Sequence, residues 1–134
     1  MIVVDTNILA YLWISGLRSR DAELALDKDS LWIAPFLWRS EFRNVLTQHV
    51  RKKLLSLESA VDTMQKAERQ MNKNEFHLPS EKILELVITS KCSAYDCEYM
   101  ALAQQFVVKV VTADKIILSE FPRVAISLEN FIEE

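Results

Sequence analysis

The sequence predicts a three-layer α/β/α fold with a central, mainly parallel β-sheet, built as one domain over residues 1–134. Short, continuously apolar segments that have the character of buried strands recur along the chain, and amphipathic helical segments lie between them. This alternation is typical of a parallel sheet covered by helices on both faces. A length of 134 residues suits a single domain with a substantial hydrophobic core.

In the first half of the chain, apolar runs and helical periodicity predict two strands and four helices. They are a strand at 2–4, a helix at 7–14, a helix near 20–28, a strand at 31–34, a helix at 37–54 and a helix near 57–73. Pro35 favours a helix start just before the longest of these helices. Apolar residues at three- and four-residue spacing give that helix one buried face: Trp38, Phe42, Val45, Leu46 and Val50.

The second half continues the alternation with shorter elements. They are a strand at 75–78, a helix through 80–88, a helix opened by Ser93, a strand at 107–111, a short helix at 115–119, a strand at 124–126 and a turn of helix at 128–132. The helix after Ser93 carries Tyr95, Tyr99, Leu102 and Phe106 along one face. These elements complete the expected sheet.

The composition excludes two common nucleotide-binding classes. Gly16 is the only glycine, so neither a G-x-G-x-x-G loop nor a P-loop is present. The chain has 16 basic and 19 acidic residues, and this balance argues against binding nucleic acid by net charge alone. One basic strip within the long helix suits either a solvated helix face, which we prefer, or contact with a phosphate backbone: Arg39, Arg43, Arg51, Lys52 and Lys53.

The sequence shows neither the pattern of a targeting segment nor the cysteine spacing of a zinc site or a disulfide framework. The longest apolar stretches are much shorter than the ~20 residues that cross a bilayer. Asp5 and Asn7 interrupt the N-terminal apolar run, which therefore does not resemble a signal peptide. Cys92 and Cys97 have no further Cys or His pair nearby, so we expect reduced packing residues. We expect a cytoplasmic protein without a membrane partner.

Four acidic residues are predicted at the carboxyl edge of the sheet. Asp5 and Asp114 follow strands, and Asp96 begins the helix that leads into the strand at 107–111. Glu41 lies in the second turn of the helix after the strand at 31–34, on the margin of its apolar stripe. Because parallel strands share one carboxyl edge, we expect the four carboxylates to converge there, where open α/β sheets place their ligands.

Each carboxylate also has a structural explanation, and for any single one that explanation is preferred. Asp5 and Asp114 suit helix N-caps. Asp96 suits the first turn of a helix, and Glu41 suits a pair with a neighbouring arginine. Convergence is harder to explain in this way, because two carboxylates ~4 Å apart repel by about 4 kcal/mol at an effective dielectric of 20. A hard divalent cation, Mg²⁺ or Mn²⁺, resolves the repulsion.

The sequence resembles the PIN-domain ribonucleases, in particular the toxin half of VapBC-type toxin–antitoxin pairs. The resemblance rests on four stretches in the family's order and spacing: VVDTNILAYL, PFLWRSEFRNVL, SAYDCEYMALA and VVTADKIIL. It covers the whole chain and places Asp5, Glu41, Asp96 and Asp114 at the family's four acidic positions. It implies a PIN-like fold, a Mg²⁺- or Mn²⁺-dependent endoribonuclease, a homodimer and silencing by a cognate antitoxin.

The hypothesis that follows is hydrolysis of RNA phosphodiester bonds by metal-activated water. We expect Asp5 and Asp96 to be the principal metal ligands. Glu41 and Asp114 would bind a second ion, act through water or orient the attacking water. No protein nucleophile is evident, because His49 and His77 are isolated in the sequence and a packing role suits His49 on its buried stripe.

Polar and basic residues near these positions have expected supporting roles. Thr6, Asn7 and Thr112 match the family's accompanying polar positions and suit hydrogen bonds to the ligands or to a phosphate oxygen. Arg39 and Arg43 would hold phosphates of the RNA strand, although an exposed helix face explains them nearly as well.

Three other functions fit parts of the sequence. The first is an RNA-processing PIN nuclease without a toxin role. The second is a phosphatase or phosphoacceptor domain, which ranks well behind because Asn7 stands where the phosphatase signature needs a second aspartate. The third is a catalytically silent module that binds a partner through apolar residues such as Trp13, Trp32 and Trp38, most of which we expect in the core.

Overall fold

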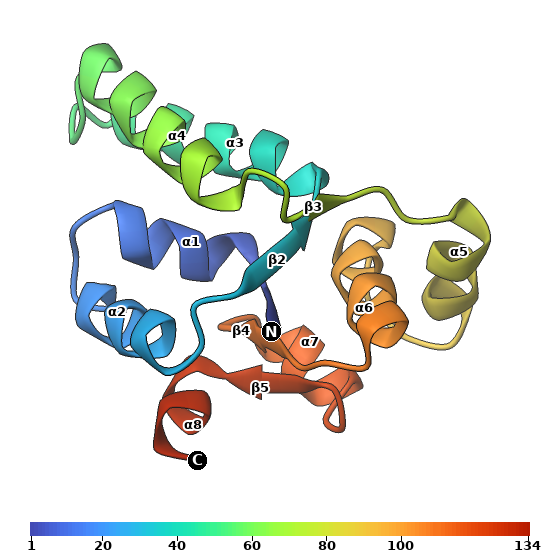
Figure 1. Cartoon of the computed structure of the whole chain (residues 1–134). Helices are drawn as coiled ribbons and strands as arrows, with labels where there is room; N and C mark the ends of the chain where they lie inside the picture. Colours follow the sequence, from blue (N-terminus) through green and yellow to red (C-terminus); the bar gives the residue numbers. More distant parts are fainter.

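The computed structural model describes all 134 residues and contains one five-stranded sheet (Figure 1). The strands are β1 (Ile2–Val4), β2 (Trp32–Pro35), β3 (Glu75–Phe76), β4 (Val110–Thr112) and β5 (Ala125–Ser127). Their order is β3-β2-β1-β4-β5, and every neighbouring pair is parallel. The predicted three-layer α/β/α class is confirmed, and the sheet is parallel throughout rather than mainly.

The central strands are apolar along their whole length because helices cover both faces of the sheet. Val3 pairs with Ile33 on β2 and with Val110 on β4, and all three side chains are buried. One hydrophobic cluster of 30 buried residues runs from Ile2 near the N-terminus to Phe131 near the C-terminus. The sheet is therefore a rigid support for whatever lies at its edges.

One face of the sheet is covered by helices from the first half of the chain and by the last helix. They are α1 (Thr6–Trp13), α2 (Ser19–Lys28), α3 (Leu37–Arg51), α4 (Leu57–Met71) and α8 (Leu128–Glu133). In this layer α1 packs against α2, α3 and α4, and α2 packs against α8. Helices α3 and α4 lie side by side and extend beyond the sheet at the top of Figure 1.

The remaining helices lie on the opposite side of the sheet, where Figure 1 shows α5 and α6 together. They are α5 (Ser80–Ile88), α6 (Ala94–Phe106) and α7 (Lys115–Glu120). Helix α6 contacts β1, β2 and β4 and is covered on its outer side by α5. It is therefore buried nearly all round, with these residues inaccessible: Cys97, Tyr99, Met100, Ala101, Leu102 and Ala103.

The strand predicted at 107–111 is wrong in its first three residues. Helix α6 continues to Phe106 and is closed by Val107, which has a left-handed φ of 54° and an 89% exposed side chain. The N–H of Val108 still donates to the carbonyl of Ala103 at 3.1 Å. The run of β-branched residues resembled a strand, but the chain needs this C-cap to leave the helix before β4 starts at Val110.

Helix α3 begins at Leu37, as predicted, although Pro35 itself does not belong to the helix start. Pro35 is the last residue of β2, and Phe36 is the N-cap of α3. Pairing with β3 extends β2 to this point, because the N–H groups of Ala34 and Phe36 donate to the carbonyls of Asn74 and Phe76. Proline is tolerated here because it lies at the end of a strand.

Both cysteines are free and buried, in line with the predicted packing role. Burial raises the pKa of the Cys92 thiol to about 11, and nearby carboxylates, led by Asp96, add to the shift. The thiol is thus kept protonated and inert. No helix in the structure has the length and apolarity needed to span a membrane.

Candidate metal-binding site at the carboxyl edge of the sheet

Asp5 is the most buried acid at the carboxyl edge of the sheet, with only 8% of the residue exposed. It directly follows β1 and caps α1, where its Oδ1 accepts the N–H of Thr6 at 2.8 Å. Its Oδ2 accepts the hydroxyl of Thr112 at 2.7 Å and the amide of Asn7 at 3.4 Å. Donors from two separate segments therefore hold this carboxylate in one orientation.

The environment of Asp5 disfavours its negative charge in the absence of a cation. Burial raises the pKa of Asp5 to about 6, and the hydrogen bonds from Thr112 and Thr6 only partly oppose this. The negative charges of Glu41 and Asp96 raise the pKa of Asp5 further. Glu41 and Asp96 are therefore each close enough to Asp5 to repel its charge.

Glu41 is held by two hydroxyl groups from different helices. Its Oε1 accepts the hydroxyl of Tyr99 on α6 at 2.6 Å and that of Thr6 on α1 at 3.1 Å. The two hydroxyl oxygens are also 2.7 Å apart, within hydrogen-bond distance. This three-way cluster joins α1, α3 and α6 beneath the acidic edge and fixes the position of the Glu41 carboxylate.

Sequence reasoning missed Tyr99 as part of the site, because it lies on the apolar face of its helix. The residue is 1% exposed, and burial together with the charges of Glu41 and Asp5 raises the pKa of its phenol well above the ordinary value. The phenol therefore stays protonated and donates to Glu41. One signal was available: a buried tyrosine hydroxyl needs a partner, and Tyr99 lies one turn after Asp96.

Asp96 and Asp114 lie on the β4 side of the same edge. Asp96 is in the first turn of α6, where its N–H donates to the hydroxyl of Ser93 at 3.1 Å. Burial raises the pKa of Asp96, and the charge of Asp114 adds to the shift. Asp114 caps α7, and its N–H donates to Thr112, whose hydroxyl in turn donates to Asp5. Thr112 thus links two of the acids.

A fifth acid, Glu98, lies beside this group. Burial raises the pKa of Glu98, the charge of Glu41 raises it further, and His77 acts in the opposite direction. Glu98 follows Asp96 by only two residues, a spacing that does not place them on one helix face, so the sequence pattern did not single it out. Its position between Glu41 and His77 is a product of the packing of α6.

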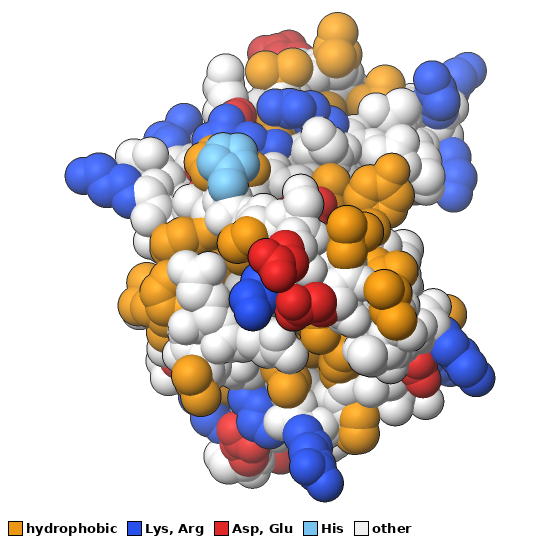
Figure 2. Space-filling model, turned by 90° about the vertical axis from the view of Figure 1, so that its right-hand side faces the viewer, with side chains coloured by type: hydrophobic (Ala, Val, Ile, Leu, Met, Phe, Trp, Pro, Cys, Tyr) orange, Lys and Arg blue, Asp and Glu red, His pale blue; other side chains and the backbone are white.

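No basic side chain neutralises the predicted acids. The ion pairs of the structure include none of Asp5, Glu41, Asp96 or Asp114. On the face drawn in Figure 2, several Lys and Arg side chains lie in the upper part near the histidine, and others lie singly elsewhere. The four acids therefore have hydrogen-bond donors but no ion-pair partner within the chain.

The two arginines that were expected to hold phosphates differ in their surroundings. Arg39 donates twice to Glu75, at 2.6 and 2.8 Å, and once to Glu68 at 2.7 Å, so its guanidinium is already occupied. Burial acts to raise the pKa of Glu75. The hydrogen bonds from Arg39 and Trp38 outweigh this effect and hold the pKa below its ordinary value. Arg39 thus supports the joint between α3, α4 and β3. Arg43 is exposed and has no ion pair, so its phosphate role stays a prediction.

The donor set at this edge fits a hard divalent cation in chemistry, because it consists of carboxylate oxygens with hydroxyl and amide groups behind them. No three His, Cys, Asp or Glu side chains lie close enough together to surround one ion. Mg²⁺ commonly binds through one or two carboxylates and keeps several waters. The residues therefore suit an ion held by Asp5 and its acidic neighbours with water completing the coordination.

The hydroxyl of Tyr99 offers a test of how this edge is held together. Tyr99→Phe is expected to lower the free energy of unfolding by about 1.5 kcal/mol, because a buried hydrogen bond to a charged acceptor is lost. Urea denaturation measures the change. Tyr95→Phe, an exposed tyrosine one turn earlier on α6, is the matched control and should change stability by less than ~0.5 kcal/mol. Equal effects in both variants would contradict the role given to the cluster.

The all-parallel α/β/α sheet and the acids without a basic partner at its carboxyl edge agree with the PIN-domain class that the sequence resembles. A family model described as PIN domain matches residues 2–126, and the chain belongs to this family. The chain is 27% identical over 124 residues to Ribonuclease VapC3 of Pyrobaculum aerophilum, covering 90% of this chain and 95% of that protein. The crystal structure of PAE2754 from Pyrobaculum aerophilum has the same fold, with a TM-score of 0.78, 18% identity and coverage of 98% and 93% of the two chains.

Proposed function

We propose that this protein is a Mg²⁺- or Mn²⁺-dependent endoribonuclease that hydrolyses RNA phosphodiester bonds as the toxin of a toxin–antitoxin pair. One observation carries the proposal: Asp5 is a buried carboxylate beside Glu41 and Asp96 and has no basic partner. Membership of the PIN-domain family and similarity to Ribonuclease VapC3 agree with it. A buried carboxylate beside other acids and without a basic partner is costly for folding, and a bound cation offsets that cost.

The roles of the chain's own residues follow from their contacts. Asp5 and Asp96 would be the principal metal ligands, with Glu41 and Asp114 ligating directly or through water. Thr112 and Asn7 orient the Asp5 carboxylate, and the hydroxyl of Thr6 orients Glu41.

When bound, Mg²⁺ or Mn²⁺ would activate the attacking water and neutralise charge that develops on the phosphate. A carboxylate that is not ligating the ion directly is available as the base that accepts the proton of the water. Arg43, exposed on α3, is the candidate for contact with a phosphate further along the RNA.

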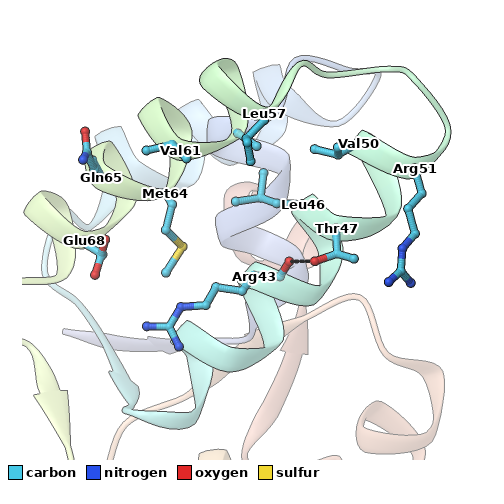
Figure 3. A pocket seen from close by; sticks show the side chains of 11 residues that line it. Arg43, Leu46, Thr47, Val50, Arg51, Leu57, Val61, Met64, Gln65 and Glu68 are labelled. Atoms are coloured by element: carbon cyan, nitrogen blue, oxygen red, sulfur yellow. Dashed lines mark hydrogen bonds between the residues drawn. The ribbon is translucent and has the colours of Figure 1, made fainter.

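A groove between α3 and α4 is the surface we assign to the antitoxin. It has a volume of about 460 Å³, and Figure 3 shows apolar side chains of the two helices meeting in it, with arginines at its border. Leu57 and Val61 are 71% and 48% exposed there. An apolar groove between two helices suits the apolar face of a third helix, here an amphipathic segment of the antitoxin. A homodimer is also part of the proposal.

Incubation of the purified protein with structured and with single-stranded RNA tests the activity. Cleavage is expected with Mg²⁺ or Mn²⁺ and should disappear when EDTA is added in excess. Gel analysis of end-labelled RNA should show internal cuts, as an endonuclease requires. Cleavage that persists in EDTA would contradict the metal dependence, and tight binding of a partner without any cleavage would favour a catalytically silent module.

The toxin role is separable from general RNA processing. A toxin is expected to have a small DNA-binding protein encoded in the neighbouring reading frame, whose co-expression abolishes cleavage. Leu57→Glu should break that inhibition without changing cleavage by the free protein, because the groove lies on the exposed α3–α4 pair and includes none of the four acids. A nuclease with no such neighbour would favour RNA processing.

A further inference from the structure

Phe36 and His77 form an exposed aromatic pair at the carboxyl edge of the sheet. Their rings are stacked, with centroids 4.3 Å apart and planes inclined by 18°. Phe36 directly follows β2 and His77 directly follows β3, and the N–H of Phe36 donates to the carbonyl of Phe76 at 3.0 Å. The parallel pairing of the two strands therefore holds the two rings together.

The pair lies beside the carboxylates on the same edge. The register of β1 with β2 places Val3 opposite Ile33, so Asp5 lies level with Pro35, directly before Phe36. Neighbouring strands are ~4.8 Å apart. The backbone of Phe36 is therefore roughly one strand spacing from that of Asp5, and the backbone of His77 is roughly two.

Both rings reach the solvent. Phe36 is 38% exposed and is not one of the buried residues of the hydrophobic core. His77 is also exposed. Each ring uses one face against the other, and both side chains remain exposed to solvent, so the pair is accessible to a further flat ring.

We propose that Phe36 and His77 form a stacking platform that binds a nucleobase of single-stranded RNA beside the carboxylates. The inference rests on the proposed ribonuclease function and names the form of its substrate. An unpaired base presents a flat face that stacks on aromatic side chains. Such contact is valuable here, because a chain with a net charge of −3 gains little affinity for RNA from its net charge.

The test measures binding of a single-stranded deoxyadenylate decamer that contains one 2-aminopurine, whose fluorescence is quenched on stacking, in the presence of Mg²⁺. Phe36→Ala and His77→Ala are each expected to weaken binding roughly 5- to 150-fold and to reduce the quenching. His77→Phe, which keeps a flat ring, should bind like the wild type. Ile88→Ala, an 84% exposed apolar residue on α5, is the matched control and should have no effect.

An abasic decamer of the same charge separates base stacking from other effects. Its binding should be equal in the wild type and in both alanine variants, since it has no base to stack. An equal loss of binding to both decamers would overturn the inference. Unchanged binding of the 2-aminopurine decamer in both alanine variants would also overturn the inference. If only self-association of the protein changed, the aromatic pair would be assigned to a protein–protein contact.

Kinetics with RNA distinguish failure of this inference from failure of the proposed function. The platform predicts that the alanine variants raise KM by the same factor as they weaken binding, with kcat nearly unchanged. Cleavage by the wild type with an unchanged KM in both variants overturns the platform alone. Absence of cleavage by the wild type overturns the proposed function.

Discussion

Replacing Asp5 or Asp96 by asparagine is expected to lower the rate of RNA cleavage by at least ~10³-fold while the protein stays folded. Asparagine has nearly the same shape as aspartate but lacks the negative charge that a hard cation requires. A loss of ~10³-fold corresponds to about 4 kcal/mol of transition-state stabilisation, which lies within the range of what a catalytic ion supplies. Cleavage of end-labelled RNA at saturating Mg²⁺ measures the rate, and circular dichroism measures the fold.

The matched control for this experiment is Asp62→Asn. Asp62 is an exposed acid on α4 that pairs with Lys66 at 3.0 Å, so its substitution should leave cleavage unchanged. Mg²⁺-dependent activity that survives in both Asp5→Asn and Asp96→Asn would refute the assignment of the site.

The metal-free protein is expected to become less stable by about 3 kcal/mol as the pH rises from about 4 to about 6. Burial raises the pKa of Asp5 from 3.8 to about 6, a difference worth about 3 kcal/mol at 1.36 kcal/mol for each pH unit. Between these two values the native state holds a proton that the unfolded state has released. The stabilisation is therefore complete below pH 3.8 and is lost as the pH passes the folded pKa of about 6.

Two comparisons isolate the contribution of Asp5 to this pH dependence. Asp96 and Glu98 also have raised pKa values and act in the same direction, so Asp5→Asn should reduce the slope without abolishing it. At pH 7 in EDTA, Asp5→Asn should raise Tm by roughly 10 °C, since about 3 kcal/mol of penalty is removed. Thermal unfolding followed by circular dichroism between pH 4 and pH 8 provides both measurements. A wild-type stability that rises with pH over this range would show that the charge of Asp5 is compensated within the chain.

Local sequence was sufficient to predict most of the fold. Ile2–Val4 is continuously apolar and is a central strand, and the long amphipathic segment after Pro35 is α3. The errors fall at element ends, as at Val107, where the same β-branched residues suit a strand or an exposed helix end. The closing of α6 depends on the distance back to the sheet, and no local pattern contains that distance.

For the candidate site, the sequence predicted the acids at the edge but not the contacts that orient them. Acids that directly follow strands, as Asp5 does, must lie at the carboxyl edge of a parallel sheet. The contact of Tyr99 with Glu41 joins residues 58 positions apart, and that of Arg39 with Glu75 joins residues 36 apart. Neither contact has a local signature in the sequence. Tyr99, which lies on the apolar face of its helix, therefore supports the site. Arg39, which was expected to hold phosphate, supports the joint between α3, α4 and β3.

The sequence by itself determined the order of strands and helices and which side chains follow the strands, because apolar periodicity and chain direction are properties of neighbouring residues. Only the tertiary structure decided which groups meet, including the stack of Phe36 on His77 and the absence of a basic partner for Asp5. The physical reason is that these contacts depend on the register between β1, β2 and β3 and on the packing of α6 against them. Register and packing arise from the whole core at once, and no short segment specifies them.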